Sequence, residues 1–271
     1  MFERLTMLEK ILERKRQEIA RVKERVSLEE LKERVGGHAR ERDFRQAIYQ
    51  PGRLCLIAEL KRKSPSKGML RERFDPVSLA QSLEEAGSSA LSVLTDEPFF
   101  GGHLDFLRDV KQFTEIPVLR KDFIIDAYQL YESLFYQADA VLLIVRALSD
   151  GQLSEYLALA RELGLDALVE IHNDEELKRA VRVDAKIIGI NHRDLTTFTL
   201  DTRLSERLIP SIPSGTTVVA ESGIQTATDV QRMHRLGVHA LLIGEALMSA
   251  ADVKVKVKEL FNGIWDVRQG T

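Results

Sequence analysis

The stretch Ile57–Gly68 reads IAELKRKSPSKG, an apolar run that ends in alternating charges and a turn rich in Pro, Ser and Gly. On a β-strand, alternate side chains share a face. Ile57, Glu59 and Lys61 therefore share one face, which is apolar at first and charged at its carboxyl end. Because buried charges are costly unless they are paired or open onto a cleft, this strand is expected to lead into a site at the carboxyl edge of a parallel sheet.

Composition favours a single large domain and excludes several classes of partner. The chain has 271 residues, 44% of them hydrophobic, which suffices for one α/β domain spanning residues 1–271. With 39 Lys and Arg against 42 Asp and Glu, the formal net charge is −3, so no nucleic acid or anionic membrane is expected as a partner. Any anion site must therefore be local.

Cysteine content and the amino terminus indicate a cytoplasmic protein. The single Cys55 excludes an intrachain disulfide framework and indicates a buried, inert thiol in a reducing compartment. Residues 1–10 lack the apolar core of a signal peptide, and no segment approaches the roughly 20 apolar residues that span a bilayer. We expect a soluble chain without a membrane partner.

Residues 1–50 are expected to form a helical extension that packs on the main body or covers an opening. Apolar residues recur at helical spacing from Leu5 to Val35, and Ser27 is a candidate N-cap, so two helices are predicted. Gly36 and Gly37 then end the pattern. The many charged residues of this segment are expected on a solvated face.

After the extension, short apolar runs alternate with helix-forming segments. This alternation predicts a parallel sheet of eight βα units, which close naturally into a (β/α)₈ barrel. An open, doubly wound sheet is the alternative, but no Gly-rich dinucleotide-binding fingerprint follows the first strand. The predicted strands are Leu54–Leu60, Ala90–Leu94, Ile116–Leu119, Ala140–Ile144, Ala167–Ile171, Ile187–Ile190, Thr217–Ala220 and Ala240–Ile243.

Polar and ionisable side chains recur where the predicted strands end. In a barrel these positions surround one mouth, so a functional site explains them better than unrelated helix caps do. The chief candidates are Glu59, Lys61 and Ser64 after the first strand, Lys121 after the third, Glu170 after the fifth, Asn191 and Arg193 after the sixth, Glu221, Ser222 and Gly223 after the seventh, and Gly244 and Glu245 after the eighth.

The segments VAESG and LLIGEAL, at the seventh and eighth strands, indicate a phosphate site. Barrels often bind phosphate there through backbone N–H groups and a short helix, although a Gly can also simply permit a turn. The carboxylate of Glu245 would repel an anion. Its side chain is therefore expected to turn away, so that only its N–H helps.

No metal site is expected, because the six His are scattered and none has a second His or a Cys at ligand spacing. His172 and His192 are expected to face away from Glu170 and Asn191, which favours structural roles.

Three phenylalanines lie in the loops that would surround the mouth: Phe99, Phe100 and Phe123. They are suited to the wall of an aromatic substrate site. Ordinary core packing explains them equally well, so the sequence leaves both interpretations open.

Seven motifs together are highly specific: IAELKRKSPS, SVLTDEPFFGG, VLRKDFIID, ADAVLLIV, LVEIHN, IGINHRDL and VAESGI. By these motifs the chain resembles the indole-3-glycerol phosphate synthases of tryptophan biosynthesis from Ile57 to about Met248, and the helical extension is also typical of that family. The resemblance implies a (β/α)₈ lyase, a decarboxylase without metal or cofactor. It would convert 1-(2-carboxyphenylamino)-1-deoxyribulose 5-phosphate, a small phosphorylated aromatic substrate, to indole-3-glycerol phosphate, carbon dioxide and water. A monomer is expected.

The resemblance also implies catalytic roles. Lys121 would be the general acid that protonates the ribulose carbonyl, and Glu170 would handle protons in the later dehydration. Lys61, held by Glu59, would pair with the substrate carboxylate; which lysine donates each proton stays open. A catalytic Lys121 is expected to have a lowered pKa, because burial disfavours its charged form.

Asn191 and Glu221 would complete the catalytic group as a polar ring around the ribulose. The remaining implied roles concern binding, and Phe100 and Phe123 would contact the substrate. Ser64 lies in a loop expected to close over the phosphate, which would be held by Ser222, Gly223, Gly244, Arg193 and the N–H of Glu245. The alternatives are another phosphate-binding barrel, such as a sugar-phosphate isomerase, and a catalytically silent scaffold.

Overall fold

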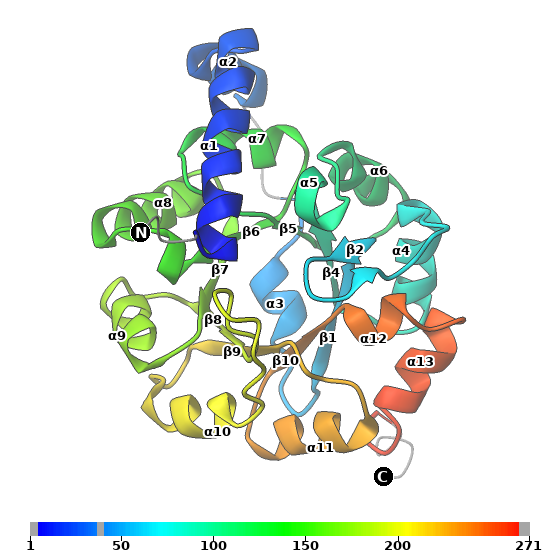
Figure 1. Ribbon diagram of the computed structural model, residues 1–271. Helices are drawn as coiled ribbons and strands as arrows, with labels where there is room; N and C mark the ends of the chain where they lie inside the picture. Colours follow the sequence, from blue (N-terminus) through cyan, green and yellow to red (C-terminus); the bar gives the residue numbers. More distant parts are fainter. Residues whose placement is uncertain (1–4, 37–40, 266–271) are drawn as a thin grey trace.

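A closed barrel of eight parallel strands forms the centre of the computed structural model, which describes residues 5–36 and 41–265 (Figure 1). Neighbouring strands pair in the order β1-β10-β9-β8-β7-β6-β5-β4, and the pairing of β1 with β4 closes the ring. This confirms the predicted (β/α)₈ fold. The barrel strands are β1 (Cys55–Leu60), β4 (Ala90–Leu94), β5 (Val118–Lys121), β6 (Ala140–Ile144), β7 (Asp166–Ile171), β8 (Ile187–Asn191), β9 (Thr217–Glu221) and β10 (Ala240–Ile243).

Helices surround the barrel, because parallel neighbours must be joined by crossovers that run back along the sheet (Figure 1). The crossover helices are α4 (Pro76–Glu85), α6 (Asp105–Phe113), α7 (Tyr128–Phe135), α8 (Asp150–Glu162), α9 (Asp174–Arg182), α10 (Leu204–Leu208) and α11 (Ala227–Arg235), and α13 (Val253–Leu260) follows the last strand. Shorter elements are α5 (Glu97–Phe100), α12 (Glu245–Met248), η1 (Val145–Ala147), η2 (Ile209–Ser211) and the ribbon of β2 (Lys63–Ser64) and β3 (Gly68–Met69). Within the described part of the chain, none of the helices has the length and apolar character needed to cross a membrane.

Strand β1 has the two faces that its sequence predicts. Cys55 and Ile57 belong to the apolar cluster inside the barrel, whereas Leu56, Ala58 and Leu60 belong to the cluster between barrel and helices. Farther along the same inward face, at the carboxyl end of the strand, the charged residues Glu59 and Lys61 follow and border the site.

The third barrel strand, β5, lies two residues later than predicted. Ile116 donates its N–H to the carboxylate of Glu84, and Pro117 has no N–H to give to a ladder, so the regular pairing begins at Val118. At the other end, Lys121 pairs with Leu94 of β4. The strand itself therefore carries Lys121.

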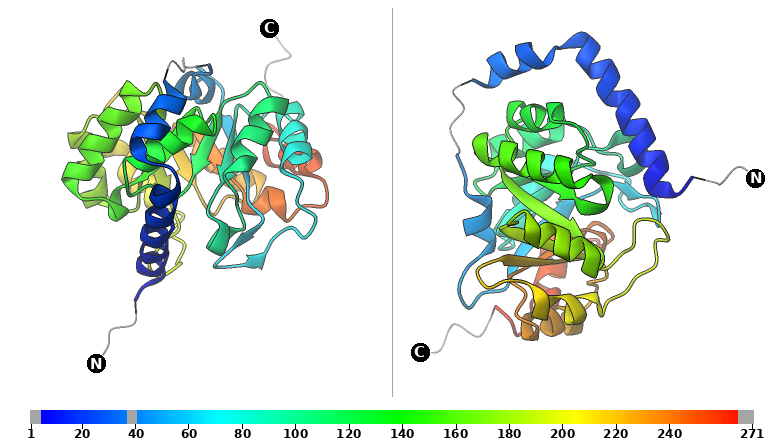
Figure 2. Two further views of the ribbon diagram at one scale, coloured as in Figure 1. Left: turned by 90° about the horizontal axis from the view of Figure 1, so that it is seen from above. Right: turned by 90° about the vertical axis from the view of Figure 1, so that its left-hand side faces the viewer.

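The extension contains three helices: α1 (Met7–Arg25), α2 (Leu28–Val35) and α3 (Phe44–Ile48). Ser27 caps α2 by accepting the N–H of Glu30, as predicted, whereas Gly37 lies outside the described residues. Helix α2 packs on α7, whereas the first half of α1 passes in front of the carboxyl ends of the strands (Figures 1 and 2). Its Leu8, Ile11 and Leu12 belong to the apolar cluster inside the barrel.

Helix α3 closes the amino-terminal end of the barrel. Phe44 and Ile48 are fully buried in the interior cluster. The N–H of Arg45 donates to Asp166, and its guanidinium donates to Thr217, which are the first residues of β7 and β9. With this end covered, access to the interior is left to the carboxyl ends of the strands.

Lys15 anchors α1 to the rim of the barrel mouth. The expectation that all charges of the extension are solvated was therefore wrong for this residue. Its side chain is 1% exposed, and Nζ lies 3.0 Å from Asp122 Oδ1 and 3.3 Å from Asp96 Oδ2. Burial by itself would raise the pKa of Asp122, but Lys15 and Arg120 hold it below its usual range. Because Asp122 follows β5 and Asp96 caps α5, this cation links α1 to both elements.

We expect Lys15→Ala to lower the free energy of unfolding by about 3–5 kcal/mol, because it leaves two buried carboxylates without their shared cation. Urea denaturation at pH 7 measures this change. Lys23 on the same helix is the matched control: it pairs with Asp126 at 2.7 Å but is 39% exposed. Lys23→Ala should cost about 1 kcal/mol or less. Equal losses in the two variants would contradict an anchoring role for Lys15.

Candidate active site

A pocket opens at the carboxyl ends of the barrel strands, the end at which barrel enzymes carry their active sites. Its open space, counted out to the mouth, is about 920 Å³, which suits a small-molecule ligand. The structure brings together on its walls all of the site residues predicted from the sequence. These are Glu59, Lys61, Ser64, Phe100, Lys121, Phe123, Glu170, Asn191, Arg193, Glu221, Ser222, Gly223, Gly244 and Glu245.

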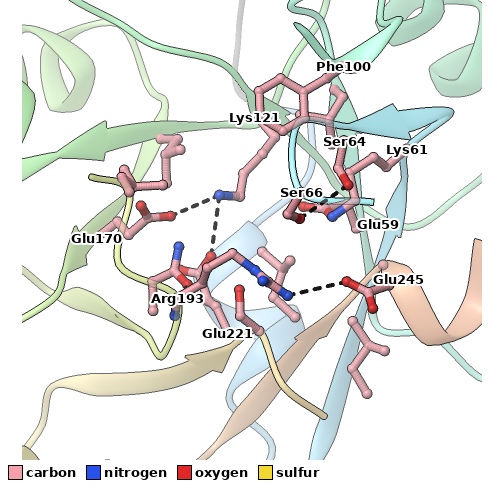
Figure 3. Close-up of a pocket in the computed structure, with 18 of the residues that line it drawn as sticks. Glu59, Lys61, Ser64, Ser66, Phe100, Lys121, Glu170, Arg193, Glu221 and Glu245 are labelled. Carbon is pink, nitrogen blue, oxygen red and sulfur yellow. Dashed lines mark hydrogen bonds and ion pairs between the residues drawn. The ribbon is translucent and has the colours of Figure 1, made fainter. Parts of the chain in front are cut away.

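The ammonium group of Lys121 lies at the centre of the polar wall, between two carboxylates (Figure 3). Its Nζ is 2.8 Å from Glu170 Oε2 and 3.3 Å from Glu221 Oε2. The three side chains come from the ends of β5, β7 and β9. Both carboxylates are almost completely buried, at 1% exposure each.

The pKa of Lys121 does not follow the sequence-based expectation. Burial by itself would lower this pKa, but the carboxylates of Glu170, Glu221 and Glu59 outweigh burial and raise it above its usual range. The expectation was wrong because it considered burial alone, whereas the neighbouring charges are anions. Lys121 is therefore held as an ammonium ion.

Glu170 and Glu221 share Lys121 yet differ in acidity. Burial would raise the pKa of Glu170, but Lys121 and His172 together bring it below its usual range. The pKa of Glu221 is raised, because burial and the charges of Glu170 and Glu59 outweigh Lys121. Two carboxyl groups whose acidities are pushed apart are suited to opposite roles, one as base and one as acid.

Two glycines make room for the buried carboxylates. A Cβ at Gly189, in the middle of β8, would overlap Glu221 Oε1, and a Cβ at Gly244 would overlap Glu59 Oε1. Gly244 is predicted from the sequence only as a phosphate-binding residue, and Gly189 is not among the predicted site residues. The signal was present, since a Gly inside a strand marks a close approach by another group.

A second lysine and glutamate pair lies across the pocket, at the end of β1. Lys61 Nζ is 2.5 Å from Glu59 Oε1, and both side chains border the pocket (Figure 3). The loop that follows is folded locally: Ser64 Oγ accepts the N–H of Lys67 and lies 3.5 Å from Ser66 Oγ. Both serine hydroxyls line the pocket.

The loops after β9 and β10 form the wall beside the end of β1, because β10 pairs with β1. Ser222 and Gly223 have φ values of +67° and +75°, and consecutive left-handed residues turn neighbouring N–H groups toward one side. A non-glycine residue in this conformation is strained, which is common at binding sites. The backbone here is therefore suited to holding an anion.

The side chain of Glu245 does not turn away from this wall, contrary to expectation. Its carboxylate lies 3.3 Å from Arg193 Nη2 and 3.8 Å from Lys67 Nζ, and it lines the pocket (Figure 3). The two cations that face it explain this orientation. The sequence analysis considered only repulsion by an incoming anion.

The expectation for His172 was wrong as well. Residues 170 and 172 are two apart and therefore share a face, and the structure places His172 Nε2 3.3 Å from Glu170 Oε1. His192 does point away from the pocket: its ring lies 2.7 Å from Ser205 Oγ and 2.9 Å from the carbonyl oxygen of Ser222.

An apolar wall completes the pocket. The rings of Phe100 and Phe123 lie 6.1 Å apart and both line it. Phe123 also belongs to the interior cluster, and Phe99 and Phe100 pack against that cluster, so wall and core packing coexist here. Leu195 and Phe198, in the loop after β8, add to this wall and were missed from the sequence because that segment, RDLTTFTL, has no regular period. Within residues 5–36 and 41–265, no three or more His, Cys, Asp or Glu are grouped to hold a metal ion.

Solved structures of other proteins share the barrel architecture. One is N-acetylmannosamine-6-phosphate 2-epimerase from Clostridium perfringens, with a TM-score of 0.60, 14% identity and coverage of 78% of this chain and 93% of that one. Another is 3-hexulose-6-phosphate synthase from Salmonella typhimurium, with a TM-score of 0.59, 13% identity and coverage of 76% and 96%. At such low identity these likenesses show the fold alone.

Sequence comparison is more specific. The family model for indole-3-glycerol phosphate synthase matches residues 8–260. The indole-3-glycerol phosphate synthase of Desulforamulus reducens is 46% identical over 255 residues, which is 94% of this chain and 96% of the relative. That of Chlorobium luteolum is 46% identical over 264 residues, or 97% and 98% of the two chains. The chain therefore belongs to the indole-3-glycerol phosphate synthase family, whose members are carboxy-lyases of tryptophan biosynthesis.

Proposed function

We propose that this protein converts 1-(2-carboxyphenylamino)-1-deoxyribulose 5-phosphate to indole-3-glycerol phosphate, carbon dioxide and water. The observation that carries the proposal is the Lys121 ammonium held between Glu170 and Glu221, facing a second pair, Lys61 and Glu59, across one pocket. Ring closure, decarboxylation and dehydration need a proton donor, a cation for the carboxylate and a base. The pocket offers all three.

Binding places the aromatic carboxylate and the ring at different walls. The Lys61 ammonium, at the end of β1, is suited to pairing with the carboxylate. Phe100 and Phe123 are suited to covering the flat face of the anthranilate ring. This orientation leaves the ribulose carbonyl near the polar centre of the pocket.

Ring closure forms a bond between the ring carbon that bears the carboxylate and the ribulose carbonyl carbon. The carbonyl oxygen becomes basic as this bond forms, and Lys121 is the proposed proton donor to it. A raised pKa does not prevent this transfer, because a developing alkoxide is a much stronger base than an amine. Loss of carbon dioxide then restores the aromatic ring, with the electron pair of the broken bond returning to it.

Dehydration removes the new hydroxyl group and a proton from the neighbouring carbon. Glu170, which the surrounding cations keep ionised, is the proposed base in this step. Glu221, whose pKa is raised, is suited to donating a hydrogen bond or proton to the departing hydroxyl. Asn191 completes the polar wall beside them.

The phosphate is proposed to bind at the loops after β9 and β10. Backbone N–H groups of Ser222, Gly223, Gly244 and Glu245 would contact its oxygens, and Arg193 would supply charge. Because Arg193 pairs with Glu245 at 3.3 Å, an incoming phosphate would take the place of that carboxylate. Ser64 is proposed to close over it from the first loop. The single-domain organisation, the monomeric state and the cytoplasmic location stay predictions.

The direct test supplies 1-(2-carboxyphenylamino)-1-deoxyribulose 5-phosphate and measures formation of the indole product by its fluorescence. Wild-type protein should form it, and inorganic phosphate should compete with the substrate. Glu170→Gln should lower kcat by about 10² or more, because the amide is the same size but cannot accept the proton.

The free energy of unfolding separates this effect from misfolding. Glu170→Gln should unfold at nearly the same urea concentration as wild type. Parallel losses of stability and activity would instead indicate a structural carboxylate, and a wild-type protein that forms no indole product would refute the proposed reaction.

A second prediction concerns Lys121→Arg. Arginine keeps the charge that Glu170 and Glu221 require, so a product-like ligand should bind within roughly tenfold of wild type. Its guanidinium does not release a proton, so kcat should fall by about 10² or more. Steady-state kinetics and ligand titration measure the two quantities.

Lys186→Arg, at the amino-terminal end of the barrel, is the matched control and should leave both quantities unchanged; Lys186 pairs there with Asp184 at 2.6 Å. A near-normal kcat with a raised KM in Lys121→Arg would show that Lys121 only binds. The proton would then have to come from Lys61.

A further inference from the structure

His172 lies behind the pocket wall and contacts the proposed base from the side opposite to the substrate. Lys121 pairs with Oε2 of Glu170, whereas the other oxygen, Oε1, lies 3.3 Å from His172 Nε2. His172 is 7% exposed. The buried carboxylate of Glu170 is thus placed between two potential cations.

The orientation of the His172 ring is fixed by Glu176, in the first turn of α9. Glu176 Oε2 lies 3.0 Å from His172 Nδ1 and accepts the backbone N–H of His172 at 2.8 Å. Its other oxygen accepts hydrogen bonds from Asn173 and from Arg146 Nε, at 2.9 and 2.8 Å. With Nδ1 directed to Glu176, Nε2 lies on the side of Glu170, at ion-pair distance but without hydrogen-bond geometry.

This setting favours the charged form of the ring. The charged groups that face it are Glu170 from β7 and Glu176 from α9, with Lys121 and Arg146 behind them. Burial would lower the pKa of His172, but the two carboxylates outweigh burial and raise it to about 9. The ring is therefore an imidazolium ion at neutral pH.

The imidazolium accounts for the difference between the two carboxylates of the site. Glu170 and Glu221 are equally buried and both contact Lys121. Glu170 has His172 as its second charged neighbour, whereas Glu221 has the anions Glu170 and Glu59. The histidine thus breaks the symmetry of the pair.

We propose that His172 is a positioning residue that keeps Glu170 ionised and fixed in orientation, and so selects Glu170 rather than Glu221 as the base. This inference rests on the proposed function, since it concerns how its base is prepared. Glu176 contacts His172 and so acts on Glu170 only through that ring. It also holds Arg146, which pairs at 2.6 Å with Asp194 in the loop after β8, so substituting His172 is the more specific test.

The test substitutes His172→Gln, which keeps a polar side chain of similar length but removes the charge. We expect kcat to fall at least tenfold while KM changes less than about threefold, because the binding groups stay in place. Glu170 loses a cation that lowers its pKa, so protonation at higher pH now inactivates it. The acidic limb of the kcat–pH profile should therefore move to higher pH.

His239→Gln is the matched control. This histidine lies at the amino-terminal end of the barrel, where Nδ1 accepts the N–H of Val218 and the ring packs against Tyr49. Its substitution should leave the pH profile unchanged. A purely structural role for His172 would change stability without moving the acidic limb.

The outcomes separate this inference from the proposed function. If wild type forms product and Glu170→Gln fails, but His172→Gln keeps its kcat and pH profile, the inference is overturned and the function stands. If wild type forms no product, or His172→Gln does not fold, ¹⁵N NMR of the wild-type histidine rings decides. Both ring nitrogens of His172 should then be protonated up to about pH 9, and a neutral ring at pH 7 would overturn the inference.

Discussion

The ammonium group of Lys121 is the cation on which two buried carboxylates, Glu170 and Glu221, both depend. A carboxylate this deeply buried is costly as an unpaired ion, and Lys121 is the cation that contacts both of these. These groups meet because a closed barrel brings the ends of β5, β7 and β9 around one mouth. The packing of the apolar interior thus fixes the positions at which the charges lie.

Further charged groups, in and behind the pocket wall, decide which of the two carboxylates is ionised. His172 and Glu59 make the surroundings of the two carboxylates unequal. Glu170 is therefore ionised, whereas the raised pKa of Glu221 favours its protonated form. Lys15 of α1 holds Asp122, the residue after Lys121, and so ties the helical extension to the same strand end. The extension and the site are therefore parts of one electrostatic arrangement.

Much of the fold and of the site could be predicted from local sequence patterns. Contacts between segments that are distant in the sequence could not. The alternation in IAELKRKSPSKG correctly assigned the inward face of β1, and polar strand ends correctly located the pocket. The pKa of Lys121 was predicted with the wrong sign, because it depends on anions from three other strands. Lys15 resembles any charged residue of an amphipathic helix until its partners, 81 and 107 residues later in the chain, are placed beside it. The error at His172 was one of strand parity, which the sequence alone could have avoided.

The central claim is that, of the three groups that meet at the ends of β5, β7 and β9, Lys121 is charged, Glu170 is ionised and Glu221 is protonated. Neutron diffraction from deuterated crystals of the unliganded protein near neutral pH would locate the deuterons directly. The account predicts three deuterons on Lys121 Nζ, one on the carboxyl group of Glu221 and none on Glu170. A deuteron on Glu170, with Glu221 ionised, would contradict it.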